Sequence, residues 1–146
     1  MKNVMAIVFV VVGFIGSCAQ DIPQKDVPSV VLNAFMTTYP QATDVEWELK
    51  LNVYNVGFEI GKTDHEAWYD PSGKILKHKE DVKIHALPVA VSEAVKKEFP
   101  DYKLDDADRI EENGNVFYLI ELDGTPNDRI LHVSPDGKIL ENKIDY

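Results

Sequence analysis

A turn sequence that occurs twice is the feature that most limits how this chain of 146 residues can fold. Residues 70–76 read DPSGKIL, and residues 134–140 read SPDGKIL. In each copy a proline presets φ for a β-turn, and a glycine suits the position that needs positive φ. Each copy is therefore predicted to close a β-hairpin. A calcium loop around Asp70 or Asp136 is the alternative, but it needs more oxygen ligands at fixed spacing.

A second sequence pattern, located before each group of strands, also occurs twice. Residues 27–40 read VPSVVLNAFMTTYP, and residues 87–100 read LPVAVSEAVKKEFP, at an offset of 60. Apolar residues recur at i, i+3, i+4 and i+8, which is one stripe of a helix. Proline is tolerated in the first turn, and the proline at the far end stops the helix. Each segment predicts one helix, with Phe35 and Val95 as equivalent buried positions.

After each helix the apolar period changes to two, which is typical of half-buried strands. Turns are expected at Asn52 and at Asn113-Gly114. The offset between the copies grows to 64, and we place the inserted residues near 125–127. The expected strands are 45–50, 54–60, 65–69 and 74–79 in the first copy, and 107–112, 116–122, 128–133 and 138–142 in the second.

These patterns predict an α+β fold made of two tandem repeats. Each repeat is one helix packed on a four-stranded antiparallel meander, and repeats lying side by side would form one continuous curved sheet. The first repeat is expected over residues 27–82 and the second over residues 83–146.

The N-terminus carries the pattern of an export signal. After a positive start, residues 5–15 form an apolar run that is too short for a comfortable membrane span. The following IGSC resembles a bacterial lipobox, in which an aliphatic residue and two small residues precede the cysteine that receives a lipid. We interpret residues 1–17 as a signal peptide and residues 18–26 as a linker after a lipidated Cys18.

Cys18 is the only cysteine, so a disulfide within one molecule is impossible. Ordinary signal cleavage after Ala19, which would leave Gln20 first, is the alternative to lipidation. Both routes take the protein out of the cytoplasm. Lipidation would make it a lipoprotein of the periplasm or outer membrane of a bacterium, and ordinary cleavage would make it a soluble periplasmic or secreted protein.

The net charge of −10 disfavours nucleic acid and anionic membrane surfaces as partners, because both require lysine and arginine. Contact with a membrane is expected only through the lipid. No motif for a nucleophile, a phosphate loop or a metal site is found, so no catalytic residue, metal ligand or cofactor is assigned. Surface positions are expected for the four histidines, which are His65, His78, His85 and His132.

An acidic run at residues 105–112 has the densest charge. Its carboxylates could bind Ca²⁺ or act in acid–base chemistry. Alternation along a strand would send them to both faces of the sheet, and we expect instead a solvated charged edge that discourages strand addition.

The repeated segments, from VPSVVLNAFMTTYPQATDVEWELK to SPDGKIL, resemble the PepSY-like family of secreted bacterial proteins and the tandem architecture of beta-lactamase-inhibitor proteins. The resemblance covers residues 27–142. It implies an extracytoplasmic module without known chemistry. PepSY-type modules are linked to restraining peptidases, and the beta-lactamase inhibitor binds its enzyme across a concave sheet. The inhibitor's disulfides have no counterpart here.

The sheet face opposite the helices is the expected binding surface. It should carry Glu46, Glu48, Asn55, Glu59, Glu66 and Trp68 in the first copy, and Phe117, Leu119 and Glu121 in the second. Apolar groups among carboxylates suit an interface with anchors and a charged surround. Alternatively, the C-terminal tail or the other copy covers these side chains. The candidate partner-binding residues are Trp68, Glu46, Glu48, Glu59, Glu66, Phe117 and Leu119.

The sequence therefore favours a non-enzymatic module that binds a protein of the cell envelope, with a peptidase as one candidate for restraint. The alternative is a module that binds a small ligand or Ca²⁺ through its acidic groups. An enzyme is the third interpretation, and no constellation of catalytic residues favours it. The sequence names neither the partner nor the oligomeric state.

Overall fold

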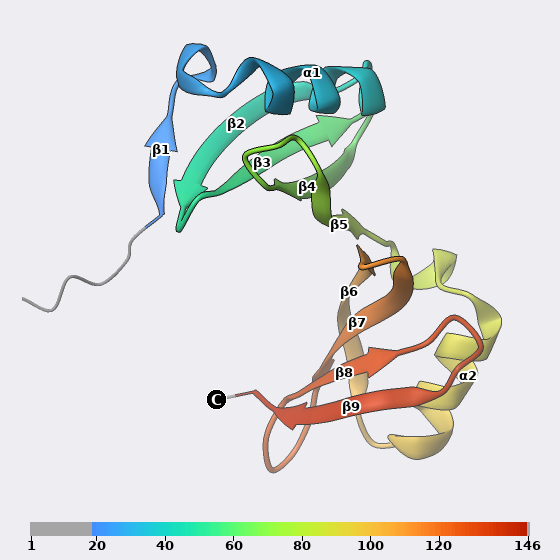
Figure 1. Cartoon of the computed structure of the whole chain (residues 1–146). Coiled ribbons are helices and arrows are strands. Elements are labelled where there is room, and N and C mark those ends of the chain that lie inside the picture. Colours follow the sequence, from blue (N-terminus) through green and yellow to red (C-terminus); the bar gives the residue numbers. More distant parts are fainter. Residues whose placement is uncertain (1–18, 146) are drawn as a thin grey trace, which may run out of the picture.

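Nine strands pair in the order in which they occur along the chain, within residues 19–145 described by the computed structural model (Figure 1). All neighbouring strands are antiparallel, and two α-helices lie against the sheet, so the predicted α+β class is confirmed. The strands are β1 (Gln20–Ile22), β2 (Thr43–Lys50), β3 (Val53–Ile60), β4 (Thr63–Tyr69), β5 (Ile75–Asp81), β6 (Lys103–Glu112), β7 (Asn115–Asp123), β8 (Arg129–Val133) and β9 (Ile139–Ile144). The helices are α1 (Ser29–Thr38) and α2 (Val89–Glu98).

The start of the described chain differs from the expected linker over residues 18–26. Gln20–Ile22 forms β1, which pairs with β2, and Gln24–Asp26 forms a 3-10 turn before α1. A second 3-10 turn, Ile84–Ala86, precedes α2 in the same way. Within residues 19–145, neither helix has the length and apolar character needed to span a membrane.

Each helix covers its own hydrophobic core. Phe35 of α1 is 3% exposed and its ring contacts those of Trp47 and Phe58, while Val95 of α2 is fully buried. The equivalence predicted for Phe35 and Val95 is thus seen in their burial. The first core holds Val27, Val31, Phe35, Trp47, Val56, Phe58, Ala67 and Tyr69, and the second holds Leu87, Val91, Val95, Ala107, Tyr118, Ile120, Leu122, Leu131 and Val133.

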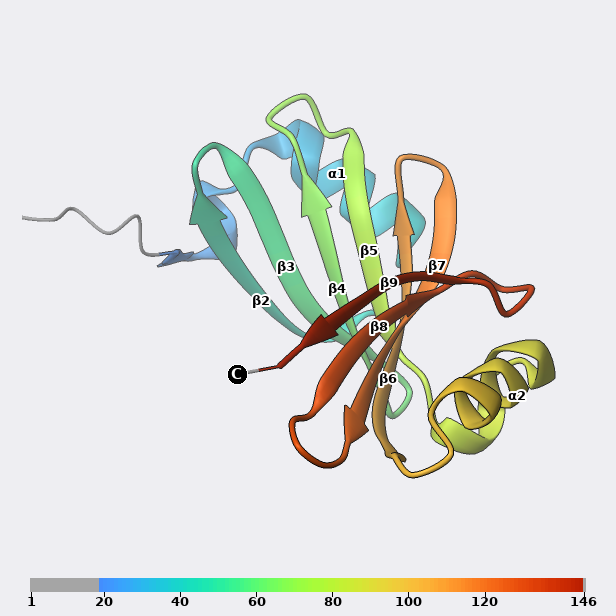
Figure 2. The same cartoon turned by 90° about the horizontal axis from the view of Figure 1, so that it is seen from below.

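Both helices lie on the same face of the continuous sheet. Ala67 in the first core pairs with His78 of β5, and His78 pairs with Glu111 of β6. Glu111 points to the same face as Ala107 of the second core, because alternate residues of a strand share a face. Over residues 19–145 the other face carries no helix, and it is called the open face here; in Figure 2, α1 is seen behind the strands.

The repeated turn is placed against the helix of its own half. Gly73 has φ +85°, and a Cβ atom at this residue would lie 2.8 Å from the carbonyl oxygen of Val30 in α1. Gly137 has φ +88°, and a Cβ atom there would collide with the carbonyl oxygen of Ala90 in α2. Glycine is therefore required twice over, by the turn and by the close approach of the helix.

The first residue of each repeated turn holds the turn closed. The Asp70 carboxylate accepts hydrogen bonds from the backbone N–H groups of Ser72, at 2.9 Å, and Lys74, at 3.1 Å. In the second copy the Ser134 hydroxyl accepts from the N–H of Lys138 at 3.1 Å. This shared role explains why aspartate and serine can exchange places between DPSG and SPDG.

The inserted residues lie in the β6–β7 hairpin, so their expected position near 125–127 is wrong. Trp47 and Ala107, 60 apart, occupy equivalent places in β2 and β6, and each pairs with a residue of the next strand. Their partners, Val56 and Ile120, are already 64 apart. The offset therefore grows between these strands, which are each extended beyond their counterparts in the first half.

The longer hairpin strengthens the connection between the two halves. Glu111 and Glu112, at the extended end of β6, pair with His78 and Lys77 of β5. The tip of the hairpin is a tight turn in which Asn113 and Gly114 both have positive φ, as a two-residue hairpin turn requires. The insertion thus adds ladder pairs at the strand boundary that joins the two cores.

Candidate functional site

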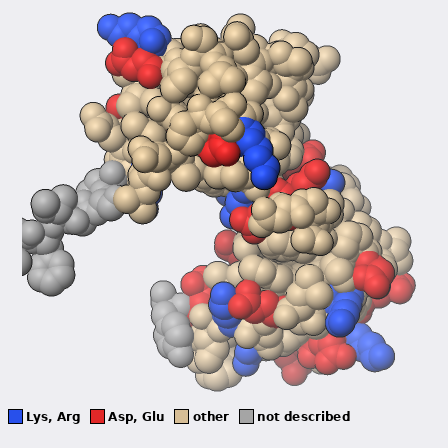
Figure 3. Space-filling view, viewed as in Figure 1, with Lys and Arg blue, Asp and Glu red and all other residues tan. Residues whose placement is uncertain are grey.

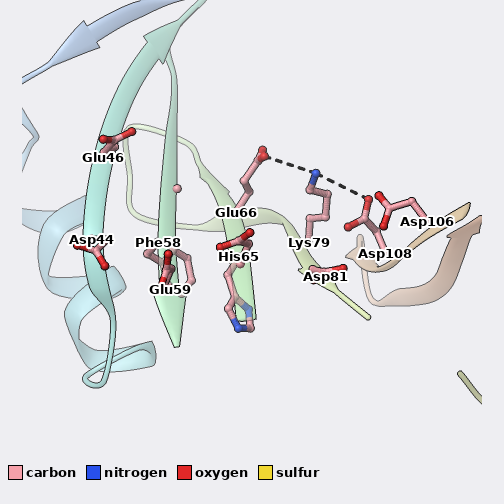
Figure 4. Close-up of a pocket in the computed structure, with 12 residues that line it drawn as sticks. Asp44, Glu46, Phe58, Glu59, His65, Glu66, Lys79, Asp81, Asp106 and Asp108 are labelled. Atoms are coloured by element: carbon pink, nitrogen blue, oxygen red, sulfur yellow. Dashed lines mark ion pairs between the residues drawn. The ribbon is translucent and has the colours of Figure 1, made fainter. Parts of the chain in front are cut away.

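An acidic groove lies on the open face of the described chain (Figure 4). Its volume is about 630 Å³. It runs from β2 to β6 across the joint between the two halves. Its charged lining consists of Asp44, Glu46, Glu59, Asp64, Glu66, Asp81, Asp106, Asp108 and Lys79. One lysine among eight carboxylates leaves a strongly negative surface.

Lys79 bridges the two halves at the floor of the groove. Its ammonium lies 3.5 Å from a Glu66 oxygen and 3.7 Å from an Asp108 oxygen. Burial lowers the pKa of Lys79, but the two carboxylates outweigh it, so the pKa is raised and the ammonium stays charged. Figure 4 shows Lys79 between these partners, which come from β4 and β6.

For Asp108, burial has a larger effect on the pKa than the neighbouring opposite charge does. It is only 8% exposed, and burial raises its pKa more than the nearby Lys79 lowers it. Asp106 and Asp81 add repulsion, and Asp81 stands directly opposite Asp108 in the ladder. Burial and mutual repulsion therefore disfavour the charged form of this carboxylate, and the positive charge of a basic partner would offset both effects.

The acidic run at residues 105–112 does not form a charged edge, so that prediction is wrong. It belongs to β6, which pairs with β5 on one side and β7 on the other. Alternation does separate its members as expected, because Asp108 lines the open face whereas Glu111 points to the helix face. The carboxylates on the open face join those of the first half.

Five of the candidate binding residues lie together on the first half of the open face. Glu46, Glu59 and Glu66 line the acidic groove. Glu48 and Trp68 line an adjoining pocket of about 310 Å³. Trp68 is partly exposed between the buried Ala67 and Tyr69, and the Lys77 ammonium lies 4.9 Å from its ring centroid.

Phe117 and Leu119 lie on the second half and are not among the residues that line the groove. The ring of Phe117 stacks on His132, with 4.9 Å between centroids, and Leu119 pairs with Asp108 and His132 in the ladder. Ile110, which sequence reasoning missed, is 2% exposed on the open face between these groups. The open face is thus acidic from β2 to β6 and carries the apolar residues Ile110, Phe117 and Leu119 next to this acidic region.

Three of the four histidines do not occupy the expected surface positions. His65 is 8% exposed and stacks on Phe58, and its Nδ1 lies 3.1 Å from Nε2 of His78. Burial and the neighbouring His65 lower the pKa of His78. His132 is partly buried beside Glu141, and only His85 is fully on the surface.

Most of the groove residues outside the list of candidate binding residues have neighbours that depend on the joint between the halves. Lys79, Asp81 and Asp108 come together because β5 pairs with β6, and this pairing links residues from the two halves of the chain. Asp44 of β2 and Asp64 of β4 contribute to the lining from within the first half. Their charge was visible in the sequence, but the face and register were not.

The described residues contain no group of three or more His, Cys, Asp or Glu side chains arranged to hold a metal ion. Cys18 lies outside the described residues. Figure 3 shows acidic residues at the waist where the two halves meet and over the half that holds α2. The groove and the adjoining pocket together form a negative, partly apolar surface.

Comparisons with known proteins agree with this fold. The sequence profile of a family described as "Putative beta-lactamase-inhibitor-like, PepSY-like" matches residues 15–77 and 52–141. A BLIP-like protein of Bacteroides fragilis is 23% identical, with a TM-score of 0.74 over 84% of this chain and 87% of that one. A protein of Bacteroides eggerthii described as "putative periplasmic" is 20% identical, with a TM-score of 0.74 over 81% and 88%. No curated protein matches the chain.

Proposed function

Because this chain belongs to the beta-lactamase-inhibitor-like, PepSY-like family, we propose that it is a non-enzymatic module that binds a protein of the cell envelope through its open face. The solved structure with a BLIP-like description shares the fold, which supports an inhibitor-like mode of binding. A peptidase is the first class of partner to test, and binding would restrain its activity.

The acidic groove is the observation that carries the proposal. Eight carboxylates on one concave surface would attract a basic partner over a distance and hold it in a defined orientation. Trp68 at the rim would serve as an anchor, since tryptophan is enriched among residues that dominate binding energy. Glu48 borders the same pocket, and Phe117 and Leu119 extend the contact onto the second half.

We also propose that the two halves are tandem repeats and that Cys18 carries a lipid on the outside of the cytoplasmic membrane. The repeated turns, helices and cores support the first point. The periplasmic description of the Bacteroides eggerthii protein supports the second. Cys18→Ala should move the protein from the membrane fraction to the soluble fraction, and a wild-type protein that is soluble and begins at Gln20 would exclude the lipid.

Capture from an envelope extract tests the binding face. The purified chain serves as bait, and captured proteins are identified by mass spectrometry. Trp68→Ala should weaken capture, since truncating such an anchor costs about 2–4 kcal/mol of binding free energy. The melting temperature of the Trp68→Ala variant should differ little from that of wild type, because the Trp68 ring lies outside both hydrophobic cores.

Charge reversal in the groove provides the matched comparison. Glu46→Lys with Glu59→Lys should abolish capture of a basic partner, whereas Glu93→Lys on the exposed side of α2 should not. Raised salt should slow association of the wild-type chain. If a captured peptidase keeps its full activity in the presence of the chain, restraint is excluded. If the groove variants capture the same partner equally well, the open face is not the binding site.

A further inference from the structure

The ninth strand leaves one edge of the sheet available for pairing. Within residues 19–145, β9 pairs with β8 on one side and with no strand on the other. The opposite edge, β1, is three residues long, whereas β9 has six. An unpaired strand of this length presents a row of N–H and C=O groups that can accept another strand.

The outward backbone groups of β9 can be assigned from one hydrogen bond. The N–H of Asp145 donates to the carbonyl oxygen of Asp128 at 3.0 Å, so Asp145 faces β8. Backbone groups alternate in an antiparallel strand, so Lys143 and Glu141 also face β8. Asn142 and Ile144 therefore direct their N–H and C=O groups away from the sheet.

We propose that β9 pairs with β9 of a second copy of this chain, antiparallel and centred on Asn142. The two Asn142 residues then form a hydrogen-bonded pair with both outward groups. Glu141 stands opposite the second copy's Lys143, and the second copy's Ile144 lies beside Leu140, the residue at which the β8–β9 register shifts. Each of these contacts occurs twice, as the two-fold symmetry of a homodimer requires.

The charges of β9 select this register. An antiparallel pair centred on Glu141 would bring two glutamates face to face, and one centred on Lys143 would bring two lysines together, both of which are unfavourable. Centring on Asn142 places opposite charges in contact instead. It also covers Leu140 and Ile144, which are 53% and 37% exposed in the single chain.

The open face already holds part of the resulting ion network. The Lys143 ammonium lies 2.8 Å from Glu141 Oε1, and Glu141 Oε2 lies 3.2 Å from Nδ1 of His132. In the dimer, glutamate and lysine alternate across the new strand boundary. A two-fold axis perpendicular to the sheet keeps both open faces on one side, so the two acidic grooves would face the same way.

Analytical ultracentrifugation of the chain from Ala19 onward, which contains all nine strands described, tests this pairing. Wild type should shift from monomer to dimer as its concentration rises from about 1 μM to about 1 mM. Lys143→Glu should raise the dimer dissociation constant about tenfold, because two attractive cross-strand pairs become repulsive. The double variant Glu141→Lys with Lys143→Glu should restore dimerisation, since it exchanges the charges and keeps them opposite.

Two further variants separate strand pairing from other effects. Asn142→Pro removes an outward N–H that β8 does not use, so it should block the dimer while circular dichroism shows a folded monomer. Lys138→Glu makes the same charge change in the exposed β8–β9 turn and should leave the dimer intact. The proposal is overturned by a wild-type chain that stays monomeric throughout, or by a dimer that Lys143→Glu and Asn142→Pro leave unchanged.

Discussion

Tyr69 shows that the first core tolerates an unsatisfied polar group. It is 1% exposed, and its hydroxyl, like Nε1 of Trp47, is buried without a hydrogen-bond partner in the described part of the chain. Burial raises the pKa of Tyr69, so the hydroxyl stays neutral. Burying a polar group that loses its hydrogen bonds to water lowers the stability of the folded state.

Tyr69→Phe should therefore leave the free energy of unfolding unchanged or raise it by about 1 kcal/mol, because it removes a buried hydroxyl and keeps the ring. Chemical denaturation followed by circular dichroism measures this. Tyr54→Phe, at a partly exposed site, is the control and should have little effect. A loss of stability in Tyr69→Phe would mean that the hydroxyl has a partner after all.

His78 gives the fold a defined response to acid. Burial holds the pKa of His78 below its ordinary value, so the folded protein resists protonation that the unfolded chain accepts near pH 6.5. The unfolded state then binds more protons as the pH falls, and stability decreases. This contribution is present above about pH 6.5 and is lost as the pH falls towards the pKa of the folded state.

Between about pH 7.5 and about pH 5.5, the free energy of unfolding should fall more steeply in wild type than in His78→Gln, which removes the titrating group. His85→Gln, on the surface, should retain the slope of wild type. Urea titrations at several pH values provide the measurement. Equal slopes for wild type and His78→Gln would show that His78 does not resist protonation in the folded protein.

At the scale of single elements, the repeated turn joins a hairpin to a helix. Gly73→Ala should destabilise the protein by about 2 kcal/mol or more, because positive φ and collision with the Val30 carbonyl act together. Gly61→Ala is the matched control, since Gly61 has φ +67° but open space around it. It should cost about 1 kcal/mol. Equal losses in thermal stability for both variants would show that the turn does not press against α1.

The elements themselves could be predicted from the sequence because each depends on local chemistry. Apolar spacing around Val31 and Phe35 is sufficient to define α1, and Asn113-Gly114 is sufficient to define a hairpin turn. What failed depended on pairing between distant residues. The acidic run could not be assigned to a central strand without the β5–β6 register, and β1 has only three residues, too few for a visible period.

At the scale of the whole molecule, two separate cores share one sheet. The cores have no residue in common, and the β5–β6 ladder connects them. The longer β6–β7 hairpin adds the pairs Lys77–Glu112 and His78–Glu111 to this ladder. The halves should therefore unfold together only as long as this connection holds.

Replacing residues 111–116 with a two-residue Asn-Gly turn should separate the two halves energetically. Differential scanning calorimetry should then show two transitions, where wild type shows one. Gly61→Ala, which alters a turn within the first half, should keep a single transition at a lower temperature. One unchanged transition in the shortened variant would show that the remaining pairs couple the halves fully.

The position of β1 also sets the length of any tether. Gln20 already pairs with Leu49, so Ala19 alone separates the sheet from Cys18. A lipid on Cys18 would hold the sheet edge within about 7 Å of the anchor, at about 3.5 Å per extended residue. Ala19 also lines the pocket that contains Trp68, which places this end of the open face nearest the lipid. A tether this short would confine the molecule to diffusion in the plane of the membrane. It would then meet proteins held at the same membrane surface far more often than proteins that diffuse freely.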